Sequence, residues 1–404
     1  MGDTIMQSLE YNKNIPIKAH FDTIVVGGGI AGVSAAVAAS RQGANVLLVE
    51  KTVMLGGLAT TGIIIYYLPL CNGLGRKVTG GIAEELLHLS IKYGHSTLPD
   101  GWKMGNDNGP TKRYMSMFNP ASFTIALDEL VISEGITLLL DTNVCDVVTK
   151  GNKISGIITS NSDGLCMYSA DSFVDASGQA LLFWQAGDET VAHKNFMSYW
   201  AQSIDLNSLN KATQSGDIGK AIKVDDLFFN AMGKDHDGNF KKESYLANSG
   251  DDVTQFILDG RKGLLKDEEL LKQGKKAWIT LPGMVQYRKI RRIKSPYVLS
   301  ETDVNKRFEN SIGVVSDWRK PGPIYEIPFN TLYGKYDNLL AAGRCIGAKG
   351  DAWEVVRCIP QVALTGQGAG VAAAMISDSK MNASDLDIKH LQSLLTKQGV
   401  MLHF

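Results

Sequence analysis

The sequence predicts an α/β fold in which a parallel sheet is assembled from both ends of the chain, with an α+β unit inserted between them. Near the N-terminus a buried strand, a helix of small residues and a second buried strand fit within about thirty residues, as a parallel strand–helix–strand unit requires. These elements cover 21–26, 30–42 and 45–49. A buried strand over 337–342 and an apolar helix over 360–376 return near the C-terminus, and the region between the two parts differs in character.

The segments between these two parts predict further elements. Over 187–280 the sequence is polar, rich in Lys and Asp and without α/β alternation, so we interpret it as part of the inserted unit. Apolar periodicity and turn residues predict, in chain order, a helix near 82–92, a loop over 95–120, a helix over 121–134, a strand-like run over 136–149, a hairpin over 153–170 with its turn at 161–164, a strand over 171–176 and strand-like pieces within 297–330.

The composition argues against several classes of protein. With 41 basic and 42 acidic residues among 404, the chain has a net charge of -1 and no broad attraction to nucleic acid or to a membrane surface. The longest apolar stretches, 63–70 and 361–376, are short or interrupted by glycine, so we expect core segments rather than membrane spans. The five cysteines form no C-x-x-C pair and the seven histidines no metal spacing, so we expect no metal and a reducing cytoplasm.

A glycine-rich turn joins the first predicted strand to the helix. It reads Gly27-Gly28-Gly29-Ile30-Ala31-Gly32, a G-x-G-x-x-G. Gly27 permits the tight turn, Gly29 lets backbone amides approach a pyrophosphate, and Gly32 lets the helix pack closely on the sheet. The helix N-terminus adds unpaired N–H groups and a partial positive charge. Glu50, at the end of the second strand, is placed to accept hydrogen bonds from ribose hydroxyls, so the unit predicts a dinucleotide site.

The same fingerprint serves NAD and FAD, and two later segments favour FAD. The second strand is followed by Gly56-Gly57-Leu58-Ala59-Thr60, where the Gly-Gly pair lets the chain pass close to a long extended cofactor. A later strand, ending at Asp175, enters the turn Ala176-Ser177-Gly178. Small residues in that turn allow it to approach the diphosphate end of a cofactor without a side-chain clash.

In these segments the chain resembles the FAD-dependent oxidoreductases of the glutathione-reductase-like superfamily, and more narrowly the bacterial FAD-dependent oxidoreductase family. The shared features are the flavin fingerprint, a Glu, a Gly-Gly-x-Ala-Thr segment, an Asp-Ala-Thr-Gly-like strand and a C-terminal Ala-Gly-Arg segment. They stand here at 27–32, Glu50, 56–60, 175–178 and 342–344, and the likeness extends to 288–293 and 366–369 but is poor across 195–250.

Two positions depart from the family pattern. Ser177 stands where Thr is usual, which is a mild change. Gly350-Asp351 stands where relatives often carry His-Glu, so neither a histidine-based mechanism nor a covalent histidyl link is carried over to this chain.

The resemblance implies a discontinuous Rossmann-like FAD-binding domain of the glutathione-reductase-like type, with an inserted α+β substrate domain. The first part of the FAD-binding domain covers 20–180, the substrate or cap domain 181–330 and the last part of the FAD-binding domain 331–385, after an N-terminal extension over 1–19. The C-terminal helix, which Pro360 opens, would direct its N-terminus at the flavin ring.

The residues expected to contact FAD come from all of these segments. They are Gly27, Gly29, Ile30, Ala31, Gly32, Glu50, Lys51, Gly56, Gly57, Leu58, Ala59, Thr60, Val144, Ala176, Ser177, Gly178, Gly343, Arg344, Gln361 and Val362.

Three arginines are the candidates for the chemistry. Arg357 lies just before the C-terminal helix, where it can face the ring, and Arg288 and Arg292 share one side of either a helix or a strand. An arginine pair can fork onto a carboxylate or a phosphate, although a solvated basic stripe is an equally good interpretation. His193 is a possible base but is better explained as a surface residue. A further group after the cofactor loop can line either a pocket or the core: Tyr66, Tyr67, Cys71 and Asn72.

The sequence therefore predicts an FAD-dependent oxidoreductase that transfers a hydride between a small organic substrate and the flavin. A nicotinamide-linked dehydrogenase and a non-catalytic flavin-binding subunit of an electron-transfer complex stay open as alternatives. A single visible fingerprint favours a separate electron acceptor over a second bound nucleotide. We expect no nucleic-acid or membrane partner, and a homo-oligomer is compatible with the sequence.

Overall fold

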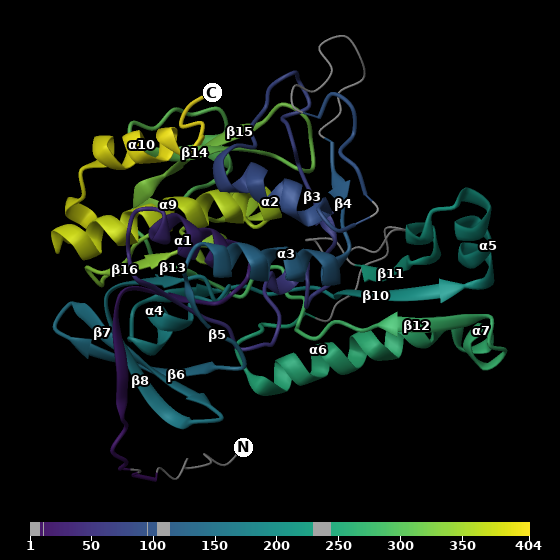
Figure 1. Cartoon of the computed structure of the whole chain (residues 1–404), viewed down its shortest axis with the longest axis horizontal. Helices are drawn as coiled ribbons and strands as arrows, with labels where there is room; N and C mark the ends of the chain where they lie inside the picture. The colour runs from purple at the N-terminus through teal and green to yellow at the C-terminus, as the bar shows by residue number, and fades with distance from the viewer. Residues whose placement is uncertain (1–8, 11, 95, 103–113, 229–243) are drawn as a thin grey trace.

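The computed structural model describes residues 9–10, 12–94, 96–102, 114–228 and 244–404. Its main sheet has seven strands in the order β5-β2-β1-β8-β7-β6, with β16 also paired to β8 (Figure 1). The strands are β1 (Ile17–Val26), β2 (Val46–Val49), β5 (Thr137–Leu139), β6 (Asn143–Lys150), β7 (Lys153–Asn161), β8 (Gly164–Asp175) and β16 (Leu339–Ala341).

The core of this sheet is parallel, and its register brings the carboxyl ends of the strands together. β5, β2, β1, β8 and β16 pair in parallel, whereas β8, β7 and β6 form an antiparallel meander. Val26 is aligned with Val49 on one side and with Asp175 on the other. The loops that follow these strands, which are far apart in the sequence, thus begin at the same edge of the sheet. The predicted mixed α/β fold with a parallel core is confirmed.

Two of the predicted strands have different limits. The expected hairpin strand and the strand over 171–176 are one continuous strand, β8, because its first half pairs with β7 and its second half with β1 and β16. The run over 136–149 is two strands, β5 and β6, which pair with different partners. Asp141, at φ 48°, turns the chain between them, and the amide of Thr142 donates to the carbonyl of Glu50 (3.0 Å). The turn places the start of β6 beside the end of β2.

Helices of small residues cover this sheet. α1 (Ile30–Ser40) packs against α9 (Ile359–Ser379), and these two lie side by side in Figure 1. The others around them are α2 (Gly81–Ile91), α3 (Pro120–Ser133), α4 (Leu181–Gln185), α8 (Gly350–Val356) and α10 (Ile388–Lys397). Among the described residues, α9 alone is long and apolar enough to cross a membrane, and 89% of that stretch is buried inside the protein, as in a core helix.

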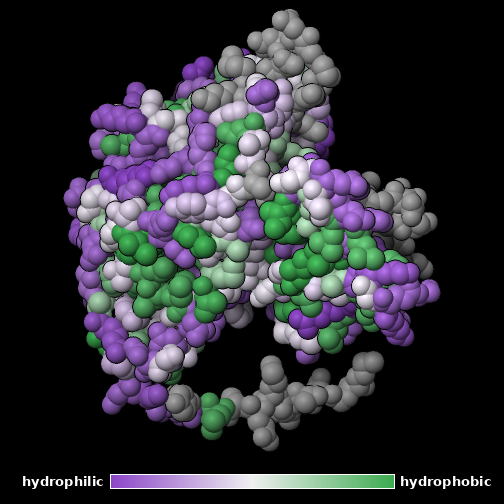
Figure 2. Space-filling model, turned by 45° about the vertical axis from the view of Figure 1, so that its right-hand side comes forward, coloured by the Kyte–Doolittle hydropathy of each residue, from purple (hydrophilic) through white to green (hydrophobic). Residues whose placement is uncertain are grey.

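The region over 187–280 contains regular elements that its polar composition does not indicate. A small antiparallel sheet, β11-β10-β12, packs with α6 around a second apolar cluster that includes Tyr199, Phe256 and Tyr287, while α5 and α7 flank the sheet. These elements are β10 (Ser198–Asp205), α5 (Leu206–Ser215), β11 (Lys223–Phe228), α6 (Gly250–Gly263), α7 (Glu268–Lys272) and β12 (Lys276–Thr280). Figure 2 shows apolar side chains on the surface of this smaller lobe, where Leu258 and Ile279 are exposed.

Within the described residues, three two-stranded ribbons complete the fold. They are β3 (Tyr66–Tyr67) with β4 (Ser116–Met117), β9 (Thr190–Ala192) with β13 (Arg291–Ile293), and β14 (Ser311–Ser316) with β15 (Ile324–Pro328). β4 lies in the described end of the stretch expected to be a loop, whose residues 95 and 103–113 lie outside the described part of the chain.

Candidate functional site

A cavity of about 330 Å³ opens at the carboxyl edge of the parallel strands. Its lining comes from the turn after β1, the end of β2, the start of β6, the turn after β8, the turn after β16 and the start of α9. All of the residues expected to contact FAD lie in this lining except Gly32, Thr60 and Gln361. Residues from separate segments of the sequence therefore meet in one place.

The turn after β1 leaves its backbone bare on the cavity side. Gly27 has φ 103°, and a Cβ there would lie 2.6 Å from the carbonyl oxygen of Ala176. A Cβ on Gly32 would lie 1.7 Å from the carbonyl oxygen of Gly27, so Gly32 supports the turn from beneath instead of facing the cavity. Gly29 caps α1 without a side-chain hydrogen bond, and a Cβ there would meet only the Cα of Gly57, at 3.9 Å. This space in front of the α1 N-terminus fits a phosphate that approaches the backbone.

The Gly-Gly segment is fastened directly to this turn. The amide of Gly56, which has φ 100°, donates to the carbonyl of Gly28 (2.8 Å). Leu58 and Ala59 continue along the cavity in a short 3-10 helix, Gly57–Ala59. Thr60 turns away, because its buried hydroxyl donates to the carbonyl of Leu55 (2.5 Å) and so stabilises the loop from behind.

Glu50 is held at the rim by backbone amides. Its Oε2 accepts a hydrogen bond from the amide of Gly28 (2.7 Å), and its Oε1 accepts one from the amide of Thr52 (2.8 Å). The side chain is 6% exposed and lines the cavity. Each carboxylate oxygen keeps further lone-pair capacity, which suits hydroxyl donors such as those of a ribose.

We expect Glu50→Gln to weaken FAD binding. The amide side chain keeps the size of Glu50, but it removes the negative charge and turns one of the two acceptors into a donor. A hydrogen bond to a charged group contributes about 1.5–3 kcal/mol, so the dissociation constant should rise roughly tenfold to a hundredfold. Titration of apoprotein with FAD, followed by quenching of flavin fluorescence, measures it. An unchanged constant in a variant of normal thermal stability would remove Glu50 from the site.

A buried carboxylate organises the turn after β8. Asp175 is fully buried and accepts hydrogen bonds from the Ser177 hydroxyl (2.6 Å), the Ser177 amide (3.1 Å) and the Leu182 amide (2.8 Å). Burial raises the pKa of Asp175, and these donors oppose that shift. The serine hydroxyl makes a bond that a threonine hydroxyl could also make, which explains why Ser is tolerated at position 177.

Arg344 connects this turn to the segment before β13. Its Nε donates to the carbonyl of Gly178 (2.6 Å) and its Nη1 to the carbonyl of Tyr287. Burial, and then the charge of Arg357, lower the pKa of Arg344 to about 10, so the guanidinium stays protonated at neutral pH. Its two bonds are to neutral carbonyls, and the residue lines the cavity.

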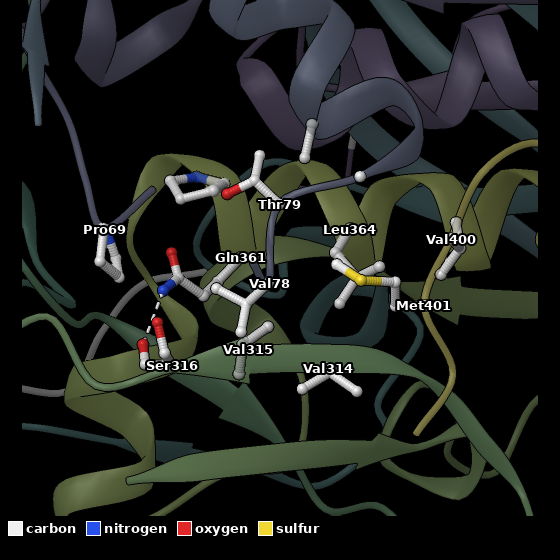
Figure 3. A pocket seen from close by; sticks show the side chains of 13 residues that line it. Pro69, Val78, Thr79, Val314, Val315, Ser316, Gln361, Leu364, Val400 and Met401 are labelled. Atoms are coloured by element: carbon white, nitrogen blue, oxygen red, sulfur yellow. Dashed lines mark hydrogen bonds between the residues drawn. The ribbon is translucent and has the colours of Figure 1, made fainter. Parts of the chain in front are cut away.

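The N-terminus of α9 meets the cavity through Ile359 and Val362. Gln361 lies on another side of the helix, where it lines a small separate cavity with Thr79, Ser316 and Met401 (Figure 3). Its Nε2 donates to the carbonyl of Ser316 (3.0 Å). Successive residues of a helix point about 100° apart, so the side chains of Gln361 and Val362 point in different directions. Gln361 therefore lies outside the lining of the main cavity, and its expected contact with FAD stays a prediction.

The expected pair of candidate arginines, Arg288 and Arg292, does not meet at the cavity, and the third candidate, Arg357, does line it. The burial of Arg288, and then the charge of Arg357, lower the pKa of Arg288 to about 10. Arg292 lies in β13, where its Nη1 donates to the carbonyl of Ile293 (3.1 Å). Arg288 is thus close enough to respond to the charge of Arg357, but both Arg288 and Arg292 lie outside the cavity lining.

The sequence did not point to the groups that surround these arginines. Glu354, in α8, makes ion pairs with Lys289 (2.6 Å) and with Arg357 (2.6 Å). Burial alone would raise the pKa of Glu354, but the charges of Arg357 and Lys289 outweigh it and lower the pKa to about 2. His193 is half-buried against Trp353, with ring centroids 5.3 Å apart. Burial and the charge of Lys289 lower its pKa, so it is not the surface residue that was expected.

The residues after the cofactor loop have structural surroundings. The hydroxyl of Tyr67 donates to the carbonyl of Ala83, and Tyr66 packs edge-on against Trp200. The Asn72 side chain accepts hydrogen bonds from the amides of Leu74 and Arg76, and Cys71 is fully buried. No group of three or more potential metal ligands gathers within the part of the chain that the structure describes.

Comparisons with known proteins identify the family of this chain. A sequence model of the family described as FAD dependent oxidoreductase matches residues 22–241 and 195–395. Thioredoxin reductase of Ureaplasma parvum serovar 3 is 35% identical over 71 residues, which are 18% of this chain and 23% of that protein. Protein FixC of Escherichia coli strain K12 is 27% identical over 140 residues, 34% of this chain and 32% of that protein. The chain thus matches less than a third of the length of either relative.

Solved structures give distant likenesses. A geranylgeranyl bacteriochlorophyll reductase-like protein from Thermoplasma acidophilum has a TM-score of 0.47 and 13% identity, with 95% of this chain and 84% of that chain covered.

Proposed function

The chain belongs to the FAD dependent oxidoreductase family, and from this we propose that it transfers a hydride between a small organic substrate and FAD in the cavity at the carboxyl edge of the sheet. It is an FAD-dependent oxidoreductase, with FAD as its cofactor, so FAD is favoured over NAD as the ligand of the glycine fingerprint. The observation that carries the proposal is the single cavity that joins the bare backbone at Gly29 to the N-terminus of α9 at Val362.

The cavity residues suit the successive parts of FAD. The amides of 29–31 would meet the pyrophosphate, because they stand at the N-terminus of α1. Glu50 would accept hydrogen bonds from the ribose. The N-terminus of α9 would lie near the pyrimidine edge of the ring, where a partial positive charge favours the reduced form. When bound, FAD supplies two-electron chemistry, and the protein supplies binding, orientation and electrostatics.

We propose the finer assignments from the same arrangement. The fold is of the glutathione-reductase-like type, with an FAD-binding domain formed by 20–180 and 331–385 and a substrate domain over 181–330. The pairing of β16 with β8 is consistent with this division, because it unites a late strand with the early ones. We further propose a small-molecule substrate, a separate electron acceptor and a cytoplasmic location. Of the three candidate arginines, Arg357 is the one with a place in the cavity lining.

Anaerobic spectroscopy tests the reaction. We expect purified protein to show the visible absorption bands of oxidised flavin and to lose them on addition of a small organic substrate, without NAD(P)H. The bands should return when an electron acceptor is added. Bleaching by NAD(P)H alone would instead favour a nicotinamide-linked reductase. A bound flavin that exchanges electrons with no small molecule in a broad panel would favour the non-catalytic alternative.

A further inference from the structure

A group of cations with too few carboxylates borders the α9 end of the cavity. Lys289 Nζ lies 2.6 Å from Oε1 of Glu354, and Arg357 donates to Oε2 of the same carboxylate from Nη2 (2.6 Å) and Nε (2.9 Å). Arg288 lies close enough for its pKa to respond to both Arg357 and Glu354. Lys289 and Arg357 therefore share one negative charge, and Arg288 adds a further positive charge nearby. Cys358 cannot offset the difference, because burial raises the pKa of its thiol to about 12.

Two other partly buried cations in the described structure are balanced differently. Lys276 has two carboxylates, those of Asp225 (2.8 Å) and Asp267 (2.6 Å). Arg319 also has two, those of Asp317 (2.9 Å) and Asp351 (2.9 Å). At Glu354 the ratio of carboxylates to cations is reversed, since one carboxylate pairs with two cations. Glu354 cannot gain charge to compensate, because it is already ionised at neutral pH.

The guanidinium of Arg357 is also fixed in position. It lies over the ring of Trp318, 5.8 Å from the centroid, and the Trp318 indole donates to the backbone carbonyl of Glu354 (3.0 Å). Its Nε and Nη2 are occupied by Glu354, while Nη1 makes no hydrogen bond within the residues described here. Arg357 lines the cavity next to Ile359, and Met284 and Arg344 belong to the same lining. A guanidinium held in this way loses little side-chain entropy when it binds an anion.

We propose that this end of the cavity binds the carboxylate group of an organic-acid substrate. Arg357 makes the contact, and Arg288 and Lys289 add the positive field that favours it. A carboxylate matches a guanidinium in charge and geometry and can be met by two parallel hydrogen bonds. The inference rests on the proposed function, because it names the substrate class of that same cavity.

The cofactor itself does not account for these charges. Its phosphates are expected at the α1 N-terminus, whereas Arg357 lies between α8 and α9. The ring is neutral when oxidised, so an anion that binds the oxidised holoenzyme is a separate molecule. A role limited to the reduced ring predicts a change in the flavin reduction potential without any binding of carboxylates.

Spectral titration of the oxidised, FAD-loaded protein separates these possibilities. Acetate and succinate should shift the flavin absorption bands in a saturable manner, whereas acetamide, which is neutral and similar in shape to acetate, should not. Inorganic phosphate distinguishes a carboxylate site from a general oxyanion site. Arg357→Gln should raise the carboxylate dissociation constant by about tenfold to a hundredfold, as expected for loss of one charged partner. Arg307→Gln removes the same charge from an exposed position and should leave the constant unchanged.

Separate control measurements distinguish a loss of folding from a loss of carboxylate binding. Arg357→Gln leaves Glu354 with one cation fewer, so FAD occupancy and melting temperature are measured first. If this variant does not fold, Arg288→Gln is titrated with carboxylates in the same way. It keeps both ion pairs of Glu354, and it should also raise the carboxylate dissociation constant. The proposal is overturned if wild type ignores carboxylates, if it binds only phosphate, or if the folded cluster variants titrate like Arg307→Gln. Because binding is read without turnover, carboxylate binding with no flavin reduction by any organic acid would count against the proposed reaction instead.

Discussion

Replacing Gly29 with valine is expected to give a folded protein that no longer retains FAD. The backbone at Gly29 has φ -67° and ψ 178°, which valine adopts readily. A Cβ there would meet no atom nearer than the Cα of Gly57, at 3.9 Å. The fold therefore has room for the new side chain, but this room is the space in which the pyrophosphate would approach the α1 amides.

The expected loss is large because several strong contacts fail together. A hydrogen bond from a backbone amide to a charged phosphate contributes about 1.5–3 kcal/mol, so the loss of two raises the dissociation constant by roughly a hundredfold or more. FAD content after purification and a titration of the apoprotein measure this loss. Gly250→Val is the matched control, since Gly250 is exposed, lies in α6 and has nothing within 4 Å of its Cβ position. Normal flavin content in Gly29→Val would contradict the assignment of this turn to the phosphates.

The sequence predicted the cofactor end of the site well because that end depends on local geometry. A turn that needs Gly27 and Gly32, followed by Glu50 at the end of the next strand, is encoded within one strand–helix–strand unit. Parallel pairing then brings the turns at Ala176 and Gly343 to the same edge. For these segments, the residues of a sequence motif are also neighbours in space, and most of the residues expected to contact FAD line one cavity.

The proposed substrate end was not predictable in the same way. Its central ion pairs join Glu354 to Lys289 and to Arg357, and Lys289 comes from a distant part of the chain. The segment around Lys289 is irregular before β13, so spacing could not show which side chains point inward. Arg288 and Arg292 were paired because they stand four residues apart, but that rule applies only within a regular element. Glu354 carried no signal, since a lone glutamate in a short helix is usually exposed.

Replacing Gly366 with alanine is expected to destabilise the protein, although alanine is the better helix former. Gly366 lies within α9 and faces α1, and a Cβ there would lie 2.2 Å from the carbonyl oxygen of Ala31 and 2.9 Å from the Cβ of Ser34. Gly370 repeats the contact one turn later, with a Cβ position 2.1 Å from the carbonyl oxygen of Ala35. The small residues of these two helices therefore set the distance between them. A larger side chain at this contact would push the helices apart and disrupt the packing of the core.

The sign of the stability change decides between the two effects. Intrinsic propensity alone predicts that Gly→Ala within a helix stabilises by about 1 kcal/mol. Overpacking of a tight core costs about 1–3 kcal/mol, and a clash with backbone belongs at the upper end because the carbonyl cannot rotate aside. Denaturant unfolding should therefore show a net loss for Gly366→Ala, and an unchanged or increased stability for Gly250→Ala in the exposed first turn of α6. FAD affinity should fall with the stability of Gly366→Ala, because Ala31 both contacts α9 and lines the cofactor cavity. A Gly366→Ala protein as stable as wild type would show that α1 and α9 are not packed this closely.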